Sequence, residues 1–503
     1  MTFTRLPSSL GWLFASLCLA FLFRLPSFPF SVIDWDESTF AIMGDSVMRG
    51  HLPYTELTDN KPPLIFLFFA AIQALFGKSL LAIRLAATVL TALTAWLCVL
   101  TARRAFGLGP WSMLALVPVV ALASVKPGTG ALLTEHLAIL PMAGALYLLT
   151  ADHWRPGRAF ALGLFAALAV LTRTNLVYPA ILLAFAALRL KPIPGAHRLT
   201  IIAAFGAGAV LPLVLLLAAY RDALDVLYRA TVAGPLAYSG GASLFTPAWF
   251  RSIGALLALC FQPSMALLSA GFAAGAALAL ARPDRRGMAV ALLIGWLGTV
   301  AGIAAGGWMF EHYLIQLLPF MAPLFALAME PMARARRRTI ALVATVLCVW
   351  WGAMLAQPYR YHAQRLRAGA WGEPDPPAQL VAHLDRAGAR GKTLFIADAH
   401  IAYWLLDAVP PTRVVHPSNL GLPAMMRAVL GPEWSAASEL DAIFARAPAF
   451  VVLPDDLDLL TLDPEARRRL EHHLAQAYQI DTVIAQLRVY VRRETPAARP
   501  ARP

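Results

Sequence analysis

Charged residues are scarce in this chain. Of its 503 residues, 14% are Asp, Glu, Lys or Arg and 59% are hydrophobic, whereas an ordinary soluble domain is about 25% charged. Apolar runs near the ~20 residues that a helix needs to cross a bilayer recur from the N-terminus to about residue 356. The shortage of charge therefore excludes a soluble globular protein and predicts a polytopic α-helical membrane protein.

Acidic residues and cysteines are also few. The chain has 29 Asp and Glu against 42 Lys and Arg, a net charge of +13, but the basic residues separate the apolar runs instead of gathering on one surface. This spacing favours membrane topology over nucleic-acid binding. All 4 cysteines lie inside apolar runs, with no CxxC or Cys/His spacing, so no disulfide and no zinc site are expected.

The basic residues predict how the chain threads the membrane. Positive clusters stay on the cytoplasmic side, and one arrangement satisfies every cluster, with the N-terminus inside and the first apolar run retained as a helix. The clusters are Arg103/Arg104, Arg155/Arg158, Arg189/Lys191/Arg198, Arg282/Arg285/Arg286 and Arg334/Arg336/Arg337/Arg338. The resulting 11 spans lie at about residues 8–24, 80–101, 110–125, 136–151, 159–172, 175–190, 198–219, 262–281, 288–305, 314–330 and 339–356.

Two more helical segments lie in the loop after the first span. The stretch "PPLIFLFFAAIQALFG" has only about 16 residues, begins with two prolines and ends at Gly77, and the stretch after Asp36 has apolar residues at helical spacing up to Gly50. An odd number of spans requires that the first of these stretches does not cross the membrane. We therefore expect two interfacial helices in the first outer loop.

The composition changes at residue 357. The stretch "WGEPDPPAQ" is rich in proline, and short apolar runs such as "TLFIAD" and "AFVVLPDD" then alternate with helix-like stretches, which is an α/β pattern. We therefore divide the chain into a transmembrane domain, residues 1–356, and a small extracytoplasmic α/β domain, residues 357–503. Because this second part has no Gly-rich phosphate loop and no triad motif, we expect an accessory role for it.

Three acidic residues crowd into "DWDESTF" in the first outer loop: Asp34, Asp36 and Glu37. One interpretation is structural, with Asp36 capping the following helix and Glu37 in its first turn. The other is catalytic, because a carboxylate on an outer loop at the bilayer surface can act as general base toward a hydroxyl acceptor. The two roles are compatible.

Lys61 stands just before the predicted helix in "TDNKPPL". Asn60 can cap that helix, and the positive end of the helix dipole already favours an anion there. The lysine can snorkel to lipid headgroups, or it can hold a bound phosphate. Both interpretations fit the sequence.

Other polar residues fall at the outer ends of predicted spans, where charge tends to mark function. Glu135 and His136 begin the helix after "KPGTGALLT". One interpretation is N-capping of this helix by Thr134; the other is a second carboxylate that orients an acceptor or holds a divalent cation. Arg173, His312 and Tyr313 bring a guanidinium, an imidazole and a phenol to the same membrane face. Such groups stabilise the negative charge of a departing phosphate.

These residues carry a resemblance to a known family. The segment "DWDESTFAIMGDSVMRGHLPYTELTDNKPPLIF" resembles the first periplasmic loop of GT-C membrane glycosyltransferases, in the branch with protein O-mannosyltransferases, the lipid A aminoarabinose transferase and rhizobial galacturonosyl transferases. Its Asp-Glu pair and Lys-Pro-Pro-like turn are matched by Asp36, Glu37, Lys61, Pro62 and Pro63. "GTGALLTEHLAI" and "FEHYLIQLLPFMAPLFALA" are similar to two further family segments, although relatives often place an Asp one residue before the position of Glu135. The resemblance covers roughly residues 10 to 330.

The resemblance implies transfer of a sugar from a polyprenyl-phosphate donor to a lipid, glycan or protein acceptor, on the outer side of the bacterial cytoplasmic membrane and with inversion at the anomeric carbon. Asp36, with Glu37 beside it, would be the catalytic base. The donor-phosphate site would consist of Lys61, Arg173, His312 and Tyr313. A second acidic site for the acceptor or the sugar would consist of Glu135, His136 and Asp34.

Three alternatives stay open. A flippase for lipid-linked sugars would also need outer charges and a lipid groove, but it predicts charges at membrane depth or paired broken helices. A surface-polysaccharide ligase would use an arginine and a histidine on an outer loop, and an assembly subunit would carry an inactive site. No cofactor is implied with certainty and a divalent cation is possible, although no ligand cluster stands out in the sequence.

Overall fold

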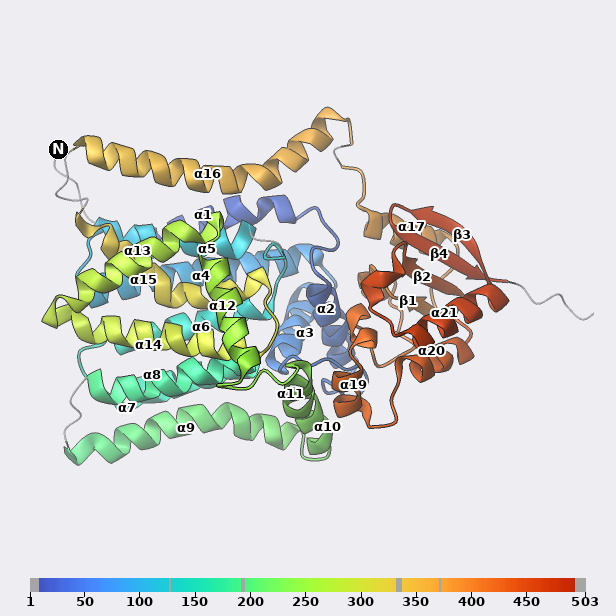
Figure 1. The fold of residues 1–503 in the computed structure, drawn as a ribbon, viewed down its shortest axis with the longest axis horizontal. Helices are drawn as coiled ribbons and strands as arrows, with labels where there is room; N and C mark the ends of the chain where they lie inside the picture. Colours follow the sequence, from blue (N-terminus) through green and yellow to red (C-terminus); the bar gives the residue numbers. More distant parts are fainter. Residues whose placement is uncertain (1–8, 126–127, 191–194, 332–336, 371, 494–503) are drawn as a thin grey trace, which may run out of the picture.

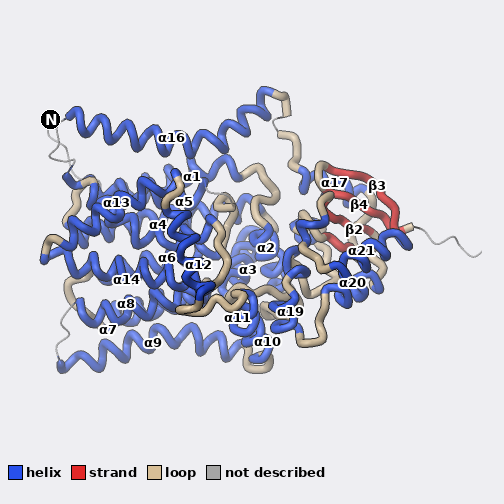
Figure 2. Tube along the Cα trace, viewed as in Figure 1, coloured by secondary structure: helices blue, strands red, loops and turns tan. Residues whose placement is uncertain are grey.

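A helical bundle joined at one end to a small α/β unit makes up the protein (Figure 1). The structure is a computed structural model that describes residues 9–125, 128–190, 195–331, 337–370 and 372–493. Strands occur within these ranges only in the C-terminal unit, as Figure 2 shows. Lys191, Arg334 and Arg336 of the predicted cytoplasmic clusters lie outside the described residues.

The bundle helices lie where the apolar runs predict them. They are α1 (Ser9–Arg24), α4 (Leu80–Phe106), α5 (Leu116–Val125), α6 (Thr134–Leu149), α7 (Pro156–Thr172), α8 (Val177–Leu190), α9 (Gly195–Ala219), α13 (Pro263–Leu280), α14 (Pro283–Ala305), α15 (Leu318–Ala328) and α16 (Arg337–Arg367). Among the described residues, 7 helical segments are long and apolar enough to cross a membrane, and α5, α6, α7 and α8 belong to shorter apolar helices. The polytopic fold is confirmed, and the number of 11 crossings stays a prediction.

Small residues let the bundle helices approach closely. A Cβ atom on Gly163 of α7 would lie 2.1 Å from the backbone oxygen of Phe205, and one on Gly208 of α9 would lie 2.0 Å from that of Phe160. Side chains larger than hydrogen would therefore force α7 and α9 apart. Such packing is typical of helices in a membrane, where burial of apolar surface does not by itself drive association.

The two helices predicted in the first outer loop are present. They are α2 (Trp35–Met48) and α3 (Leu64–Phe76), and they lie between the bundle and the C-terminal unit (Figure 1). The capping predictions were wrong: the Asp34 carboxylate caps α2 by accepting from the Asp36 amide at 2.9 Å, which leaves Asp36 in the first turn, and the N-cap position of α3 is Pro63, not Asn60. The N-cap position of α6 is likewise Leu133, not Thr134.

Four short helices that the sequence did not predict follow α9. They are α10 (Leu224–Tyr228), a π-helical turn (Arg229–Ala233), α11 (Gly234–Tyr238) and α12 (Pro247–Cys260). The backbone oxygen of Tyr238 accepts from the Trp308 indole at 2.9 Å, and the two rings stack with centroids 5.4 Å apart. This contact joins α11 to the segment that precedes α15.

The C-terminal unit contains a mixed sheet covered by helices. Its elements are α17 (Pro376–Arg386), β1 (Leu394–Ile396), α18 (Ile401–Leu405), α19 (Pro423–Leu430), α20 (Ala436–Ala445), β2 (Phe450–Pro454), α21 (Pro464–Ala477), β3 (Tyr478–Ile484) and β4 (Leu487–Arg492). The strand order is β1-β2-β4-β3, with β1 and β2 parallel and the other pairs antiparallel. The α/β pattern is confirmed; the boundary at residues 356 and 357 falls inside α16, and the division into domains stays a prediction.

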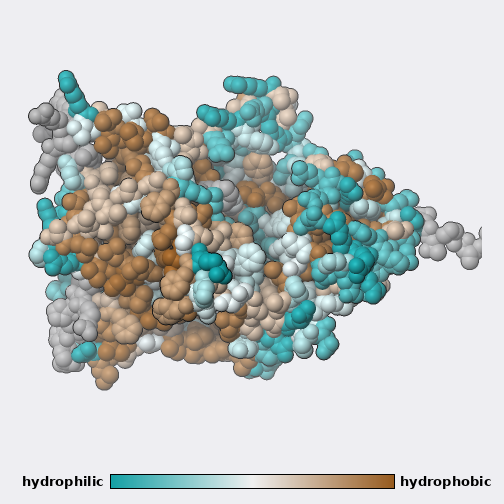
Figure 3. Space-filling view, viewed as in Figure 1, coloured by the Kyte–Doolittle hydropathy of each residue, from teal (hydrophilic) through white to brown (hydrophobic). Residues whose placement is uncertain are grey.

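Polar contacts fix the C-terminal unit on the first outer loop. The Trp404 indole donates to Gln73 Oε1 of α3 at 2.9 Å, and both side chains are buried. The Thr58 amide donates to the Arg413 backbone oxygen at 2.8 Å, and Thr58 forms a parallel β-bridge with Val414 of the C-terminal unit. In Figure 3 hydrophobic atoms dominate the visible face of the bundle and hydrophilic atoms that of the C-terminal unit.

Candidate active site

A cavity of about 760 Å³ opens where the bundle, the first outer loop and the C-terminal unit meet. The first outer loop contributes one wall, the turn before α15 a second and the C-terminal unit a third. The polar and charged residues that line it are Asp34, Asp36, Asp59, Asn60, Lys61, Tyr238, Glu311, His312, Tyr313, His416, Ser418 and Asn419. The cavity therefore collects side chains from segments that are far apart in the sequence.

Asp36 faces this cavity between two nitrogen atoms. Lys61 Nζ and His416 Nε2 each lie 3.3 Å from Asp36 Oδ1. Burial by itself would raise the pKa of Asp36, but the charge of Lys61 and the contact with His416 outweigh it and hold that pKa below its ordinary value. Burial also opposes the charge on Lys61, yet Asp36 and Asp59 raise the pKa of its ammonium above the ordinary value.

The turn that carries Lys61 is built by its neighbours. The Asp59 carboxylate accepts from the backbone amides of Asn60 at 2.5 Å and Lys61 at 3.1 Å. The Tyr54 hydroxyl donates to the Lys61 backbone oxygen at 2.6 Å. These bonds keep the ammonium pointed into the cavity, because the backbone on both sides of the residue is held.

Asp34 lines the cavity as well as capping α2. Burial, together with the charge of Asp36, raises the pKa of Asp34 to about 7. Gly128 leaves room for this carboxylate: its φ is +75°, and a Cβ atom there would lie 2.8 Å from Asp34 Oδ2. Asp34 is thus positioned to change its charge near neutral pH.

We expect Asp34 to make anion binding depend on pH. Below its pKa the group is neutral, and above it a second negative charge stands beside Asp36, so the affinity for a phosphate-bearing ligand should fall roughly three- to tenfold as pH rises through about 7. Asp34→Asn should remove this step and keep the helix cap, since Asn caps equally well. The measurement is ligand affinity between about pH 6 and pH 8; an unchanged step in the variant would contradict the assignment.

Lys61 and Tyr313 also line a smaller cavity of about 100 Å³. Arg173 lies in that second cavity, with its guanidinium carbon 4.4 Å from the centroid of the Tyr313 ring. The His312 and Tyr313 rings are in edge contact, 4.8 Å between centroids. The structure thus brings all four predicted phosphate-binding residues to adjoining cavities.

Glu135 contacts Arg173 and His312 of this group and is itself buried, with 1% of its side chain exposed. Its carboxylate lies 2.8 Å from Arg173 NH1 and 3.8 Å from His312 Nε2. Among the described residues that line the two cavities, Glu135 does not occur. It therefore lies behind the basic residues.

Glu37 and His136 are buried away from the cavities. The Glu37 carboxylate accepts from the Arg84 guanidinium and from the Leu132 amide, and it faces the bundle. His136 Nδ1 accepts from the Leu133 amide at 3.2 Å and its Nε2 lies 2.8 Å from the Ala123 backbone oxygen. Both side chains therefore fix one segment against another, and the structure separates them from the group around Asp36.

No sequence pattern predicted His416, Ser418 and Tyr238 as site residues. Asp36 and His416 meet only because the C-terminal unit docks on α2. His416 follows the apolar pair Val414 and Val415 in the proline-containing stretch "VVHPSN". No spacing rule connects such a stretch to a residue near the N-terminus. Buried Arg84 was missed for the same reason, since its acidic partner lies in another segment.

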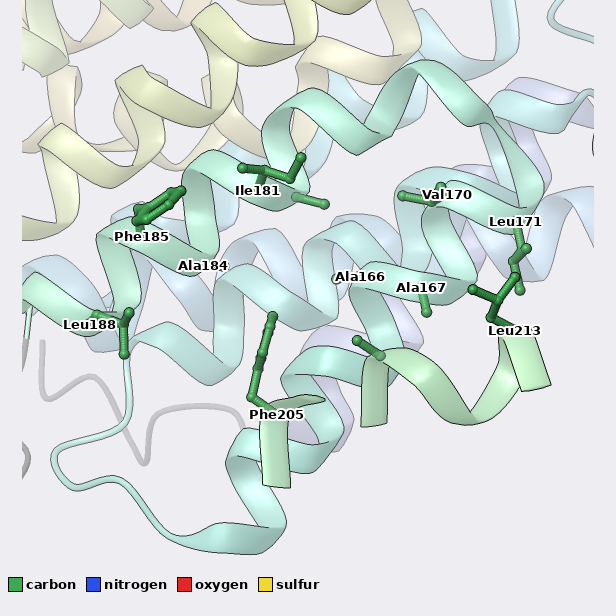
Figure 4. Close-up of a pocket in the computed structure, with 12 residues that line it drawn as sticks. Ala166, Ala167, Val170, Leu171, Ile181, Ala184, Phe185, Leu188, Phe205 and Leu213 are labelled. Carbon is green, nitrogen blue, oxygen red and sulfur yellow. The ribbon is translucent and has the colours of Figure 1, made fainter. Parts of the chain in front are cut away.

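Two apolar cavities lie among the bundle helices. One, of about 560 Å³, lies between α8, α12 and α14 and includes Ala301, the neighbour of Gly302 in the smaller polar cavity. The other, of about 370 Å³, lies between α7, α8 and α9, and all its lining residues in the described part of the chain are Ala, Val, Leu, Ile or Phe (Figure 4). The first therefore adjoins the polar site, whereas the second offers apolar contacts alone.

In the part of the chain that the structure describes, the donor atoms around the cavities do not form a cation site. Among the described residues, no group of three or more His, Cys, Asp and Glu is arranged to hold a metal ion. The carboxylates of Asp36 and Glu135 instead face Lys61 and Arg173. The residues present do not fit a dedicated metal site.

Comparison with known proteins agrees with this architecture. Residues 60–219 match the family described as dolichyl-phosphate-mannose-protein mannosyltransferase. No curated protein matches by sequence. Similar structures are ArnT from Cupriavidus metallidurans, bound to undecaprenyl phosphate and in the apo state, each with TM-score 0.64, 15% identity, and coverage of 96% of this chain and 98% of ArnT.

A third structure, the arabinofuranosyltransferase AftD from Mycobacteria, has TM-score 0.51 and 14% identity and covers 98% of this chain but 40% of AftD. The match to ArnT extends over nearly the full length of both chains, so it includes the C-terminal unit. The chain therefore has the GT-C fold of these glycosyltransferases, and residues 60–219 of it match the mannosyltransferase family.

Proposed function

We propose that this protein transfers a sugar from a polyprenyl-phosphate donor to a hydroxyl group of a lipid, glycan or protein acceptor. The observation that carries the proposal is the Asp36–Lys61 pair: a carboxylate and an ammonium lie 3.3 Å apart in a large polar cavity, with Arg173 and Tyr313 next to Lys61. A glycosyl transfer of this type needs one base and one group of cations, because a phosphate leaves without a strong acid.

Asp36 is the proposed base. The acceptor hydroxyl gives its proton to the Asp36 carboxylate while its oxygen forms a bond to the anomeric carbon, and the bond from that carbon to the phosphate oxygen breaks on the opposite face. The products are the inverted glycoside and the polyprenyl phosphate. The pair with Lys61 makes Asp36 a weak base in the free protein. A bound phosphate draws the ammonium to itself and adds negative charge nearby, and both effects raise the basicity of Asp36.

Lys61 and Arg173 are the proposed phosphate ligands, with His312 and Tyr313 beside them. Arg173 is fixed by Glu135 and by the Thr134 hydroxyl, each at 2.8 Å, so its guanidinium is oriented before the donor arrives. We assign Glu135 this positioning role, in place of contact with the acceptor or the sugar. Glu37 likewise holds the first outer loop to the bundle through Arg84, and His136 joins α5 to the start of α6.

The apolar cavity between α8, α12 and α14 suits the isoprenoid chain of the donor. Its walls include Leu182, Trp249 and Leu297, and its Ala301 precedes Gly302 of α14, which lines the small polar cavity with Lys61 and Arg173. The similarity to ArnT, which has been solved bound to undecaprenyl phosphate, supports a lipid of this class as the partner.

We further propose that the protein lies in the bacterial cytoplasmic membrane with the active site and the C-terminal unit outside. The turn with Arg282 between α13 and α14, the first turn of α14 with Arg285, and the start of α16 lie at the end of the bundle away from the C-terminal unit (Figure 1). The positive-inside rule assigns such basic turns to the cytoplasm. This arrangement supports a donor that is presented on the outer leaflet.

The test is an assay in vesicles that contain the purified protein. Radiolabelled polyprenyl-phosphate sugars are added with membrane acceptors, and the label is followed in the acceptor together with release of polyprenyl phosphate and the anomeric configuration of the product. We expect transfer with inversion for at least one sugar. Movement of intact lipid-linked sugar between leaflets without its consumption would instead identify a flippase.

A further inference from the structure

The C-terminal unit places a histidine directly on the proposed base. His416 lies just before a short 3₁₀ helix (Pro417–Gly421), and its Nε2 is 3.3 Å from Asp36 Oδ1. Its side chain is 13% exposed, and it lines the large cavity together with Ser418 and Asn419. The contact therefore lies at the site itself.

We propose that His416 is a positioning residue for sugar transfer, which orients the Asp36 carboxylate toward the acceptor hydroxyl and so makes the C-terminal unit part of the catalytic assembly. The inference rests on the proposed function above. It changes the role expected of residues 357–503, which the sequence alone indicated to be accessory.

The hydrogen-bond partners of His416 determine which ring nitrogen faces Asp36. A carboxylate can only accept hydrogen bonds, so Nε2 carries the proton that points at Asp36. Ser418 Oγ lies 2.9 Å from Nδ1 and completes the chain from Ser418 through His416 to Asp36. Because both nitrogens are engaged, the imidazole ring has little freedom to turn.

Lys61 alone does not orient Asp36. Its Nζ lies 3.3 Å from both oxygens of the carboxylate, and the proposed mechanism requires that this ammonium move toward the donor phosphate. After that movement, His416 Nε2 still donates to Oδ1. Holding Oδ1 leaves Oδ2 to take the proton of the acceptor.

Other contacts fix the same helix, α2, to the C-terminal unit. The Trp35 indole donates to Asp398 Oδ1 at 3.1 Å, and Thr39 Oγ1 lies 2.9 Å from Nε2 of the buried His400. Trp35, Asp36 and Thr39 therefore all meet C-terminal partners within slightly more than one helical turn. The geometry of Asp36 is thereby linked to docking of the whole unit.

The test compares His416→Ala, His416→Gln and the wild-type protein in the transfer assay. Because misplacement of a reacting group by about 1 Å can cost about 100-fold, we expect His416→Ala to lower kcat about 100-fold and to change the donor KM less than about threefold. The Gln amide can supply an N–H near the position of Nε2, so His416→Gln should recover to within about tenfold of wild type. Ser418→Ala should show a smaller loss in the same direction.

A matched control is His383→Ala. His383 belongs to the same unit and lies 2.6 Å from Asp481 Oδ2, but it is outside the residues that line the cavity. It should leave kcat unchanged. Wild-type kcat in both His416 variants would overturn the positioning role. The role would also be overturned if His416→Gln folds normally but loses as much kcat as His416→Ala. An inactive wild-type protein would instead count against the proposed function.

If His416→Ala does not fold, His416→Gln and Ser418→Ala still decide the question. Both keep a polar or small side chain in the loop, and the proposal predicts partial activity with an unchanged donor KM for each. The proposal would be refuted if Ser418→Ala and His416→Gln both have the activity of the wild type.

Discussion

Asp36→Asn is expected to slow sugar transfer by about 10²- to 10⁴-fold, the range that a positioned general base contributes. Asn has nearly the shape of Asp, but its amide cannot take the proton of the acceptor hydroxyl. The variant also releases Lys61, which lies 3.3 Å from the wild-type carboxylate, so donor binding should persist or tighten. The measurement is kcat together with binding of the radiolabelled donor to the purified protein.

A matched control for this variant is Asp45→Asn. Asp45 lies on the same helix, α2, and its carboxylate is 2.9 Å from Lys78 Nζ, away from the residues that line the cavity. We expect near-normal transfer from it. Retained turnover in Asp36→Asn would show that another group, or the donor phosphate itself, removes the proton.

Arg84→Met is expected to lower the free energy of unfolding by about 3–5 kcal/mol, since it leaves a buried carboxylate without its cation. The side chains of Arg84 and Glu37 are 0% and 4% exposed, and they form an ion pair. Arg84 NH2 also lies 3.3 Å from the Phe30 backbone oxygen, to which it donates. The pair therefore joins α4 to the start of the first outer loop, and unfolding in a denaturing detergent titration measures its loss.

Removal of both charges provides the internal comparison. Arg84→Met combined with Glu37→Gln should recover much of the stability, because a neutral pair carries no buried unpaired charge. The exposed Arg467, which pairs with Glu471 at 3.2 Å on α21 and also with Asp458, is a reference; Arg467→Met should have a much smaller effect on stability, because water screens an exposed ion pair. Equal losses at the two sites would refute the role of burial.

The helices and the small α/β unit were predictable because their signals are local. Apolar runs of near-spanning length marked the bundle helices, and Gly50 and Gly77 marked the ends of α2 and α3. Where a boundary depended on one hydrogen bond, local reasoning was wrong: either of two nearby carboxylates can cap α2, and the structure uses Asp34. The helices after α9 were missed because the apolar stretches there are shorter than a membrane span.

The site was partly predictable, because polar residues at the outer ends of apolar segments are costly unless they are used or paired. That reasoning found Asp36, Lys61, Arg173, His312 and Tyr313, which line the two polar cavities. It could not separate residues at the cavity from residues behind it, since exposure depends on what packs against each side chain. Glu37, Glu135 and His136 belong to the second group.

Membrane class, helix positions and the set of polar outer residues follow from local composition, because hydrophobic length and residue spacing act over one segment at a time. The meeting of Asp36 with His416, and of Glu37 with Arg84, follows only from the tertiary structure. In each pair the contact depends on how two distant segments dock, and docking is settled by the packing of the whole interface. The sequence of one segment does not specify which distant segment it will contact.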